Sequence, residues 1–91
     1  MLIMVMGVYC DGADFNSPEV ADRLNEELTF EKIRLAGQLR DGSGAKGFAV
    51  VLTAGGFQDG EAYLRESRFF GADLFREVRV LEYRLEVGRV D

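Results

Sequence analysis

The sequence of 91 residues contains no histidine and no tryptophan, and it has one cysteine and one proline. A single cysteine excludes a disulfide bond within the chain. Because histidine and cysteine supply the usual ligands of zinc and iron–sulfur sites, we expect no metal site and no cofactor. The net charge is −5, and no stretch gathers lysine and arginine without acidic neighbours, so we expect no nucleic-acid partner.

The composition is that of one globular domain spanning residues 1–91, with 47% hydrophobic and 30% charged residues. The apolar stretch Met1–Tyr9 is too short to cross a membrane. It also lacks the basic flank and the small-residue cleavage site of a secretory signal. We therefore expect a cytoplasmic protein without membrane association.

Two runs, Leu2–Tyr9 and Gly47–Thr53, are apolar at nearly every position. Short, nearly continuous apolar runs are typical of strands that are buried on both faces. We expect both runs to be such strands. The turn residues Asp41–Gly44 then join the second run to the strand that precedes it in a hairpin.

A helix is expected to begin at Ser17 and Pro18, because serine caps helix N-termini and proline fits the first turn. It is expected to fade near Phe30. Apolar residues that recur at a spacing of four form its buried stripe: Val20, Leu24 and Leu28. Three charged residues are expected to line its solvent side: Arg23, Glu26 and Glu27.

Residues 33–40 alternate between apolar and polar, which predicts a half-buried strand. The apolar members are expected to face the core: Ile33, Leu35 and Leu39. The polar members then share the opposite face, away from the helices: Arg34, Gln38 and Arg40. Further along, Asp59 is expected to cap a second helix, and the alternation from Val78 to Tyr83 predicts the last strand.

The order strand, helix, strand, strand, helix, strand is the ferredoxin-like α+β pattern with an antiparallel sheet. In this arrangement the first and third strands are central, and the helices cover one face of the sheet. Those are the two strands that are apolar on both sides. The bare face therefore predicts a homodimer that forms through the sheet, which is a dimeric α/β barrel.

The segment Leu35–Asp41 reads L-A-G-Q-L-R-D, and the segment Ser67–Phe75 reads S-R-F-F-G-A-D-L-F. Both segments, in this order, resemble the YciI-like (YCII-related) family, whose corresponding motifs are L-A-G-P-L-x-D and D-P-F-x-x-A-G-L-F. The resemblance implies the same fold and the same dimeric assembly. Within these motifs Gln38 stands at a proline, Ser67 at an aspartate and Arg68 at a second proline.

The resemblance also implies a chemistry that this chain lacks. Family enzymes are credited with a histidine–aspartate dyad, which suits general acid–base catalysis near neutral pH. This chain has no histidine, its first helix offers Arg23 and Asn25 instead, and Ser67 occupies the aspartate position. An arginine stays protonated and cannot act as a base. The dyad chemistry therefore does not carry over, and an enzymatic role is disfavoured.

We expect a YciI-like protein that binds a small organic molecule, aromatic or anionic, in a pocket beside the sheet. Two guanidinium groups and an amide on one strand face suit a carboxylate or a phenolate. The same charges also protect an edge strand from aggregation, which is the alternative explanation. The candidate ligand-binding residues are Tyr9, Arg34, Gln38, Arg40 and Phe69.

Two other functions remain compatible with the sequence. One is a divergent enzyme of the lyase, dehalogenase or isomerase type that acts on small aromatic or dicarbonyl compounds. Its base would be a carboxylate near the predicted pocket: Asp11, Asp41 or Asp73. The other is a purely structural dimerisation module. Cys10 is expected to be an inert thiol, because no histidine is present to activate it.

Overall fold

The elements of the computed structural model, which describes residues 1–11, 18–71 and 74–88, follow the order β-α-β-β-α-β. They are β1 (Leu2–Tyr9), α1 (Pro18–Leu28), β2 (Ile33–Asp41), β3 (Gly44–Thr53), α2 (Phe57–Glu66) and β4 (Phe75–Tyr83). The prediction of a ferredoxin-like α+β fold is confirmed.

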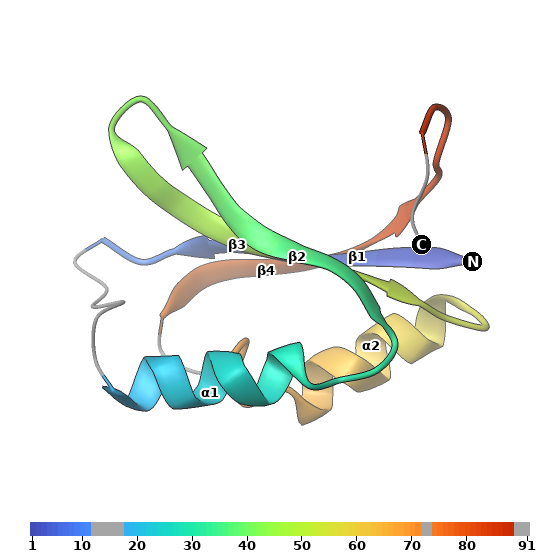
Figure 1. The fold of residues 1–91 in the computed structure, drawn as a ribbon, viewed down its shortest axis with the longest axis horizontal. Helices are drawn as coiled ribbons and strands as arrows, with labels where there is room; N and C mark the ends of the chain where they lie inside the picture. The colour runs from blue at the N-terminus through green and yellow to red at the C-terminus, as the bar shows by residue number, and fades with distance from the viewer. Residues whose placement is uncertain (12–17, 72–73, 89–91) are drawn as a thin grey trace.

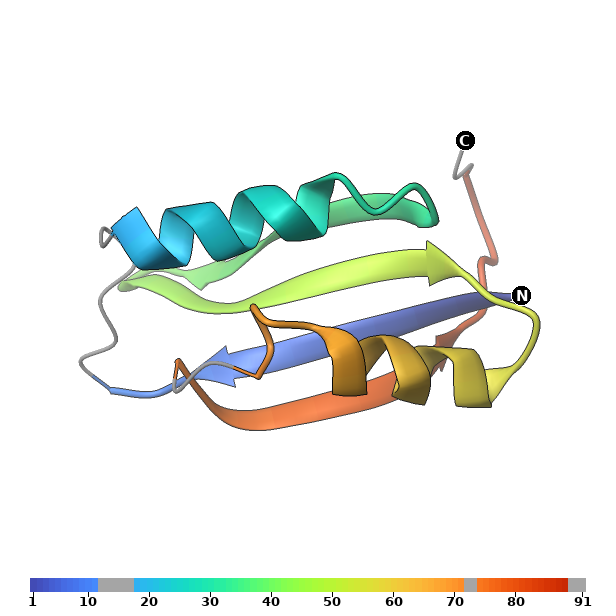
Figure 2. The same cartoon turned by 90° about the horizontal axis from the view of Figure 1, so that it is seen from below.

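The four strands form one antiparallel sheet in the order β2-β3-β1-β4, so β1 and β3 are central as predicted. Leu2 of β1 lies opposite Thr53 of β3 on one side and Tyr83 of β4 on the other. Both helices lie against the same face, with α1 alongside β2 and β3 and α2 over β1 and β4 (Figures 1 and 2). We call this the covered face and the opposite one the open face.

The hydrophobic core lies between the covered face and the helices. Alternate residues of the central strands point into it, and Ile3, Val5 and Val50 are completely buried. The approach of α2 depends on Gly60. A Cβ at this position would lie 2.5 Å from Ile3 Cγ2 and 2.9 Å from Val80 Cγ1. Any larger residue would therefore push α2 away from the sheet.

Aromatic rings from the segment after α2 complete the core. The ring of Phe69 meets those of Phe48, Phe70 and Phe75 edge-on, with centroids 5.1–5.4 Å apart. Edge-to-face contacts at these separations are favoured by the ring quadrupoles. Three phenylalanines of the segment that resembles the YciI-like family therefore pack in or against the core: Phe69, Phe70 and Phe75.

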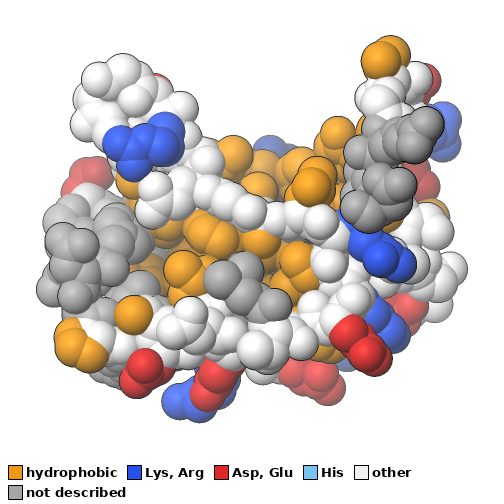
Figure 3. All heavy atoms as spheres, in the orientation of Figure 1, with side chains coloured by type: hydrophobic (Ala, Val, Ile, Leu, Met, Phe, Trp, Pro, Cys, Tyr) orange, Lys and Arg blue, Asp and Glu red, His pale blue; other side chains and the backbone are white. Residues whose placement is uncertain are grey.

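The open face is a trough. The tip of the β2–β3 hairpin and the chain after β4 both rise away from the helices (Figure 1), and hydrophobic side chains gather between these rising ends (Figure 3). In β1, alternate residues are buried on the covered face and half-buried on the open face. The open-face residues of the central strands are mostly apolar: Leu2, Met4, Met6, Val8, Gly47, Ala49, Val51 and Thr53.

The prediction of which β2 residues face the core was right for Ile33, which packs against the core, and wrong for Leu35 and Leu39. A register shift just after Ile33 places Leu35 opposite Val51, on the open face. Leu35 is 51% exposed and Leu39 is 38% exposed. A β-bulge changes the face that all the following residues take, and apolar–polar alternation does not reveal where a bulge occurs.

The start of α2 also differs from the sequence prediction. Gly56, and not Asp59, is the N-cap of α2, which begins at Phe57. The Asp59 carboxylate lies in the first turn and accepts a hydrogen bond from the Gly55 N–H at 2.8 Å. It therefore ties the start of the helix to the preceding loop. The predicted cap of α1, Ser17, lies outside the described residues, while α1 does begin at Pro18.

The β2–β3 hairpin turns at the predicted residues. One carboxylate oxygen of Asp41 accepts hydrogen bonds from the backbone N–H and the hydroxyl of Ser43, both at 2.7 Å. Gly44 has a φ of 125°, a backbone conformation that residues other than glycine rarely adopt. The strands extend to Asp41 and from Gly44, so the turn is tighter than the sequence alone predicts.

Candidate functional site

The clearest departure from the sequence prediction is a buried carboxylate on α1. Glu27 was expected on the solvent side, but only 8% of it is exposed. Its burial follows from helix geometry, because α1 lies beside α2 on the same face of the sheet and Glu27 contacts the end of α2 across the space between the two helices (Figure 2). The face that α1 presents to this space is wider than a single stripe of residues spaced by four.

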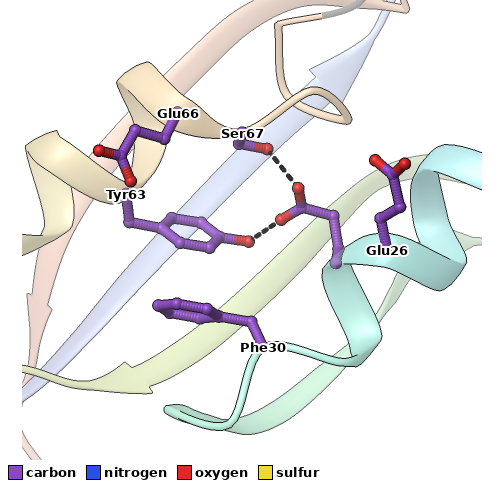
Figure 4. Close-up of a pocket in the computed structure, with 6 residues that line it drawn as sticks. Glu26, Phe30, Tyr63, Glu66 and Ser67 are labelled. Atoms are coloured by element: carbon purple, nitrogen blue, oxygen red, sulfur yellow. Dashed lines mark hydrogen bonds between the residues drawn. The ribbon is translucent and has the colours of Figure 1, made fainter.

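Two hydroxyl groups from the end of α2 hold the Glu27 carboxylate. The Tyr63 hydroxyl donates to Oε2, and the Ser67 hydroxyl donates to Oε1 at 2.9 Å. Tyr63 and Ser67 are four residues apart, so they lie on the same side of the helix end. Figure 4 shows the two side chains reaching the same carboxylate. Ser67 is itself fixed, because its Oγ accepts the Phe70 N–H at 3.0 Å.

A cavity of about 180 Å³ adjoins this hydrogen-bonded group. One wall is aromatic, since the Phe30 and Tyr63 rings lie 5.4 Å apart at an interplanar angle of 37°. The rest of the lining is polar and acidic. We call this cavity the helix pocket, and its lining residues are Glu26, Glu27, Phe30, Tyr63, Glu66 and Ser67.

Charge in the helix pocket is negative. Three of its lining residues carry carboxylates, and no lysine or arginine lines it. Glu26 forms a surface ion pair with Arg68 at 2.9 Å, which links α1 to the segment after α2. Burial raises the pKa of Tyr63, and the hydrogen bond to Glu27 and its charge raise that pKa further. Tyr63 is therefore a neutral hydrogen-bond donor at neutral pH.

This arrangement can bind a hydrogen-bond donor. Each carboxylate oxygen has two lone-pair sites, so Glu27 can accept further bonds beside those from Tyr63 and Ser67. A phenol or ammonium group meets these requirements, whereas a carboxylate would be repelled. Among the described residues, no group of three His, Cys, Asp or Glu side chains is arranged to hold a metal ion. None of the helices in the described ranges is long and apolar enough to cross a membrane.

Two of the five predicted site residues lie in the core. Phe69 is 1% exposed, and Tyr9 is also buried, with its ring 5.3 Å from that of Phe75. Burial raises the pKa of the Tyr9 hydroxyl. Both residues lie on the covered side of the sheet, and neither lines the helix pocket.

The other three predicted residues are exposed on β2 and do not share one face. Gln38 lies opposite the core residue Phe48, and its Oε1 accepts a hydrogen bond from Arg40 Nη1 at 3.1 Å. Arg34 donates from Nε to Thr53 Oγ1 at 2.8 Å, and Thr53 belongs to the open face. Along the strand, Arg34 and Arg40 are about 20 Å apart. The structure thus brings Gln38 and Arg40 together and leaves Arg34 apart.

Two of the three acids named for the enzymatic alternative are exposed. Asp11 is exposed, Asp41 is held in the hairpin turn, and Asp73 lies outside the described residues. Hydrogen bonds from Ser43 lower the pKa of the Asp41 carboxyl. Cys10 is a free, half-buried thiol. Neither Asp11, Asp41 nor Cys10 lines the helix pocket.

The sequence contained a signal for the buried group. On a helix, positions i, i+3, i+4, i+7 and i+8 share one face. Counted from Val20, these positions include Arg23 and Glu27 as well as the expected apolar residues. Residue type alone had assigned the charged members to solvent. Tyr63 and Ser67 carried no local signal, because they contact Glu27 across 36 and 40 residues of sequence.

Comparison with known proteins supports the fold. No family model matches the chain, and no curated protein matches it. One solved structure that is similar is 5-chloro-2-hydroxyhydroquinone dehydrochlorinase (TftG) from Burkholderia phenoliruptrix AC1100, in complex with 2,5-dihydroxybenzoquinone. It aligns over 92% of this chain and 94% of its own, with a TM-score of 0.62 and 16% sequence identity. At this identity the similarity shows the shared fold, and the YciI-like family stays a prediction.

Proposed function

We propose that the protein binds a small hydroxylated aromatic molecule in the helix pocket. The observation that carries this proposal is a cavity of about 180 Å³ that joins an aromatic wall to a buried, hydrogen-bonded carboxylate. An apolar cavity of roughly 150 Å³ is large enough to hold benzene. The helix pocket therefore matches the size of one six-membered ring, with Phe30 and Tyr63 beside the ring and Glu27 accepting from its hydroxyl.

Two further considerations support this ligand class. A hydrogen bond to a charged group contributes about 1.5–3 kcal/mol, which makes the Glu27 carboxylate a strong anchor for a phenol. The dehydrochlorinase of the same fold was solved with a single-ring hydroxylated quinone bound. The helix pocket is acidic, so a neutral phenol suits it better than an ionised quinone does.

Isothermal titration with benzene-1,4-diol tests the proposal, with 1,4-difluorobenzene as a ring of similar size that has no donor. We expect the diol to bind and the difluoro compound to bind at least tenfold more weakly. Glu27→Gln should weaken diol binding by a similar factor. Glu61→Gln removes an equal charge from the exposed side of α2, and it should leave binding unchanged. Equal binding of the two rings by the wild type would refute the proposal.

A second candidate function is enzymatic, and the dehydrochlorinase neighbour is the observation that favours it. In such a reaction the ring first tautomerises, with one hydroxyl proton moving to the carbon that bears chlorine. A base then removes the proton of a second hydroxyl, and chloride leaves with the electrons of the carbon–chlorine bond to give a hydroxyquinone. In this chain the base would be Glu27, since no histidine is present. Ion chromatography of chloride released from 5-chloro-2-hydroxyhydroquinone, corrected for spontaneous release, tests this. Release no faster with protein than without it would contradict dehydrochlorinase activity.

We also propose that the protein is a homodimer through its open face. The support is physical, because the open-face residues of two central strands are mostly apolar and Leu35, Leu39 and Leu81 are substantially exposed there. Contiguous apolar surface of this kind marks interaction sites in soluble proteins. A second copy offers a trough of the same character. Light scattering should give twice the chain mass of 10.2 kDa, with dissociation only on dilution.

A further inference from the structure

The helix pocket is one end of a longer groove. A second cavity of about 150 Å³ shares Phe30, Tyr63 and Glu66 with the helix pocket. We call it the middle pocket, and it is lined by Phe30, Lys32, Leu52, Thr53, Asp59, Ala62, Tyr63 and Glu66. A third, more open hollow of about 480 Å³ shares Lys32 and Thr53 with the middle pocket. We call it the Arg34 hollow, and it is lined by Glu31, Lys32, Arg34, Thr53, Ala54 and Gly55.

Charge is distributed unevenly along this groove. The helix pocket is lined by three carboxylates and no cation. The Arg34 hollow holds both cations of the groove, Lys32 and Arg34, together with one carboxylate from Glu31. Lys32 also lines the middle pocket with Asp59 and Glu66. The two ends of the groove therefore favour opposite chemical groups.

Hydrogen bonds fix the position of the basic end. The Thr53 N–H donates to the Lys32 carbonyl at 2.9 Å, and the Thr53 hydroxyl accepts from Arg34 Nε at 2.8 Å. The bond from Nε uses one of the five N–H donors of a guanidinium. The terminal nitrogens of Arg34 are the donors that form bidentate contacts with carboxylates elsewhere in proteins. Thr53 thus holds the guanidinium by its inner nitrogen at the open end of the groove.

We propose that the groove binds a hydroxyphenyl carboxylic acid in an extended pose. The phenol hydroxyl donates to Glu27, the ring lies along Phe30 and Tyr63, and an alkyl spacer crosses the middle pocket. The carboxylate then reaches Lys32 and Arg34. This inference rests on the proposed function of the helix pocket and adds the group that the far end recognises. A spacer is required, because the middle pocket separates the two charged ends.

The test compares 3-(4-hydroxyphenyl)propanoate with 3-(4-hydroxyphenyl)propan-1-ol, which has the same ring and spacer but no carboxylate. We expect the wild type to bind the acid at least tenfold more tightly than the alcohol in isothermal titration. Added salt should reduce this preference, because both cations are exposed to solvent. The acid should also bind more tightly than 4-hydroxybenzoate, whose carboxylate has no spacer.

Variants locate the carboxylate. Lys32→Gln/Arg34→Gln should abolish the preference for the acid, so that the acid and the alcohol bind with similar affinity. The matched control Lys46→Gln/Arg65→Gln removes the same two charges from exposed positions outside the groove. It should keep the preference. If loss of the contact between Arg34 and Thr53 prevents folding, Lys32→Gln alone should still reduce the preference severalfold.

The outcomes distinguish the extended groove from the ring-binding function of the helix pocket. Equal binding of acid and alcohol by the wild type, or a preference that survives in the Lys32→Gln/Arg34→Gln variant, would overturn the extended groove. Either result would leave the ring-binding function intact. Failure of both ligands and of benzene-1,4-diol to bind would overturn the proposed function and this inference together.

Discussion

The two faces of the sheet are built from the same central strands and differ in what lies against them. On the covered face, Ile3, Val5 and Val50 are completely buried beneath the helices. On the open face, the neighbouring residues Met4, Met6 and Ala49 are apolar and only half-buried. Apolar residues on a strand face therefore indicate that this face is buried against another surface. They do not indicate whether that surface belongs to the same chain or to a partner.

The largest expected effect comes from a charge on the covered face. Val50→Asp places an unpaired carboxylate among fully buried residues of the central strand β3. Burying an unpaired charge costs several kcal/mol, which is comparable with the roughly 5–15 kcal/mol that stabilises a whole domain. We expect loss of the native circular dichroism spectrum. A cooperative urea transition close to that of the wild type would show that position 50 is accessible to water in the folded protein.

The next largest effect should come from the adjacent residue. Ala49→Asp places the same charge on the open face of the same strand, so the single chain should still fold. If a second copy covers this face, the variant should be a monomer with a mass near 10.2 kDa by light scattering. A dimer of undiminished affinity would exclude the open face as the interface.

A smaller effect concerns the polar group on the covered side. Ser67→Ala removes the buried donor to Glu27 and the acceptor for the Phe70 N–H, which should cost about 1–3 kcal/mol of unfolding free energy. The control Ser43→Ala removes an equivalent hydroxyl–carboxylate bond in the exposed hairpin turn. We expect urea denaturation to show a loss below about 1 kcal/mol there. Equal losses at both positions would mean that burial adds nothing to the Glu27 contact.

The smallest effect appears at alkaline pH. Burial and Glu27 raise the pKa of Tyr63 in the folded state above its ordinary value near 10. Its contribution to stability is therefore complete below about pH 10, and it is lost as pH rises above that value. Between pH 10 and 11 the loss should be about 1 kcal/mol.

Tyr63→Phe should reduce this alkaline slope in urea denaturation series. Tyr83→Phe, which substitutes a half-buried tyrosine at the end of β4, serves as the control and should retain the slope. Because burial also raises the pKa of Tyr9, some slope should remain in the Tyr63 variant. An unchanged slope in Tyr63→Phe would show that the phenol does not donate to Glu27 in solution.

The same contrast explains what the sequence could predict. The order of elements and the central place of β1 and β3 follow from local apolar patterns, and both were predicted correctly. The face on which Leu35 lies was predicted incorrectly, because a register shift after Ile33 reverses the face of the residues up to the next shift, which follows Leu39. The Glu27 site could not be derived from local patterns, since its hydroxyl donors come from a helix distant in sequence.

The pairing of β1 has a consequence for how the chain acquires its structure. Leu2 lies opposite Tyr83, so the first strand to be synthesised cannot complete its ladder until the last one has emerged. Contacts between such distant residues give a high contact order, which is associated with slow folding. During that interval the edge of β1 that pairs with β4 has no partner. Nascent chains should therefore depend on chaperones more than a helical protein of this length does.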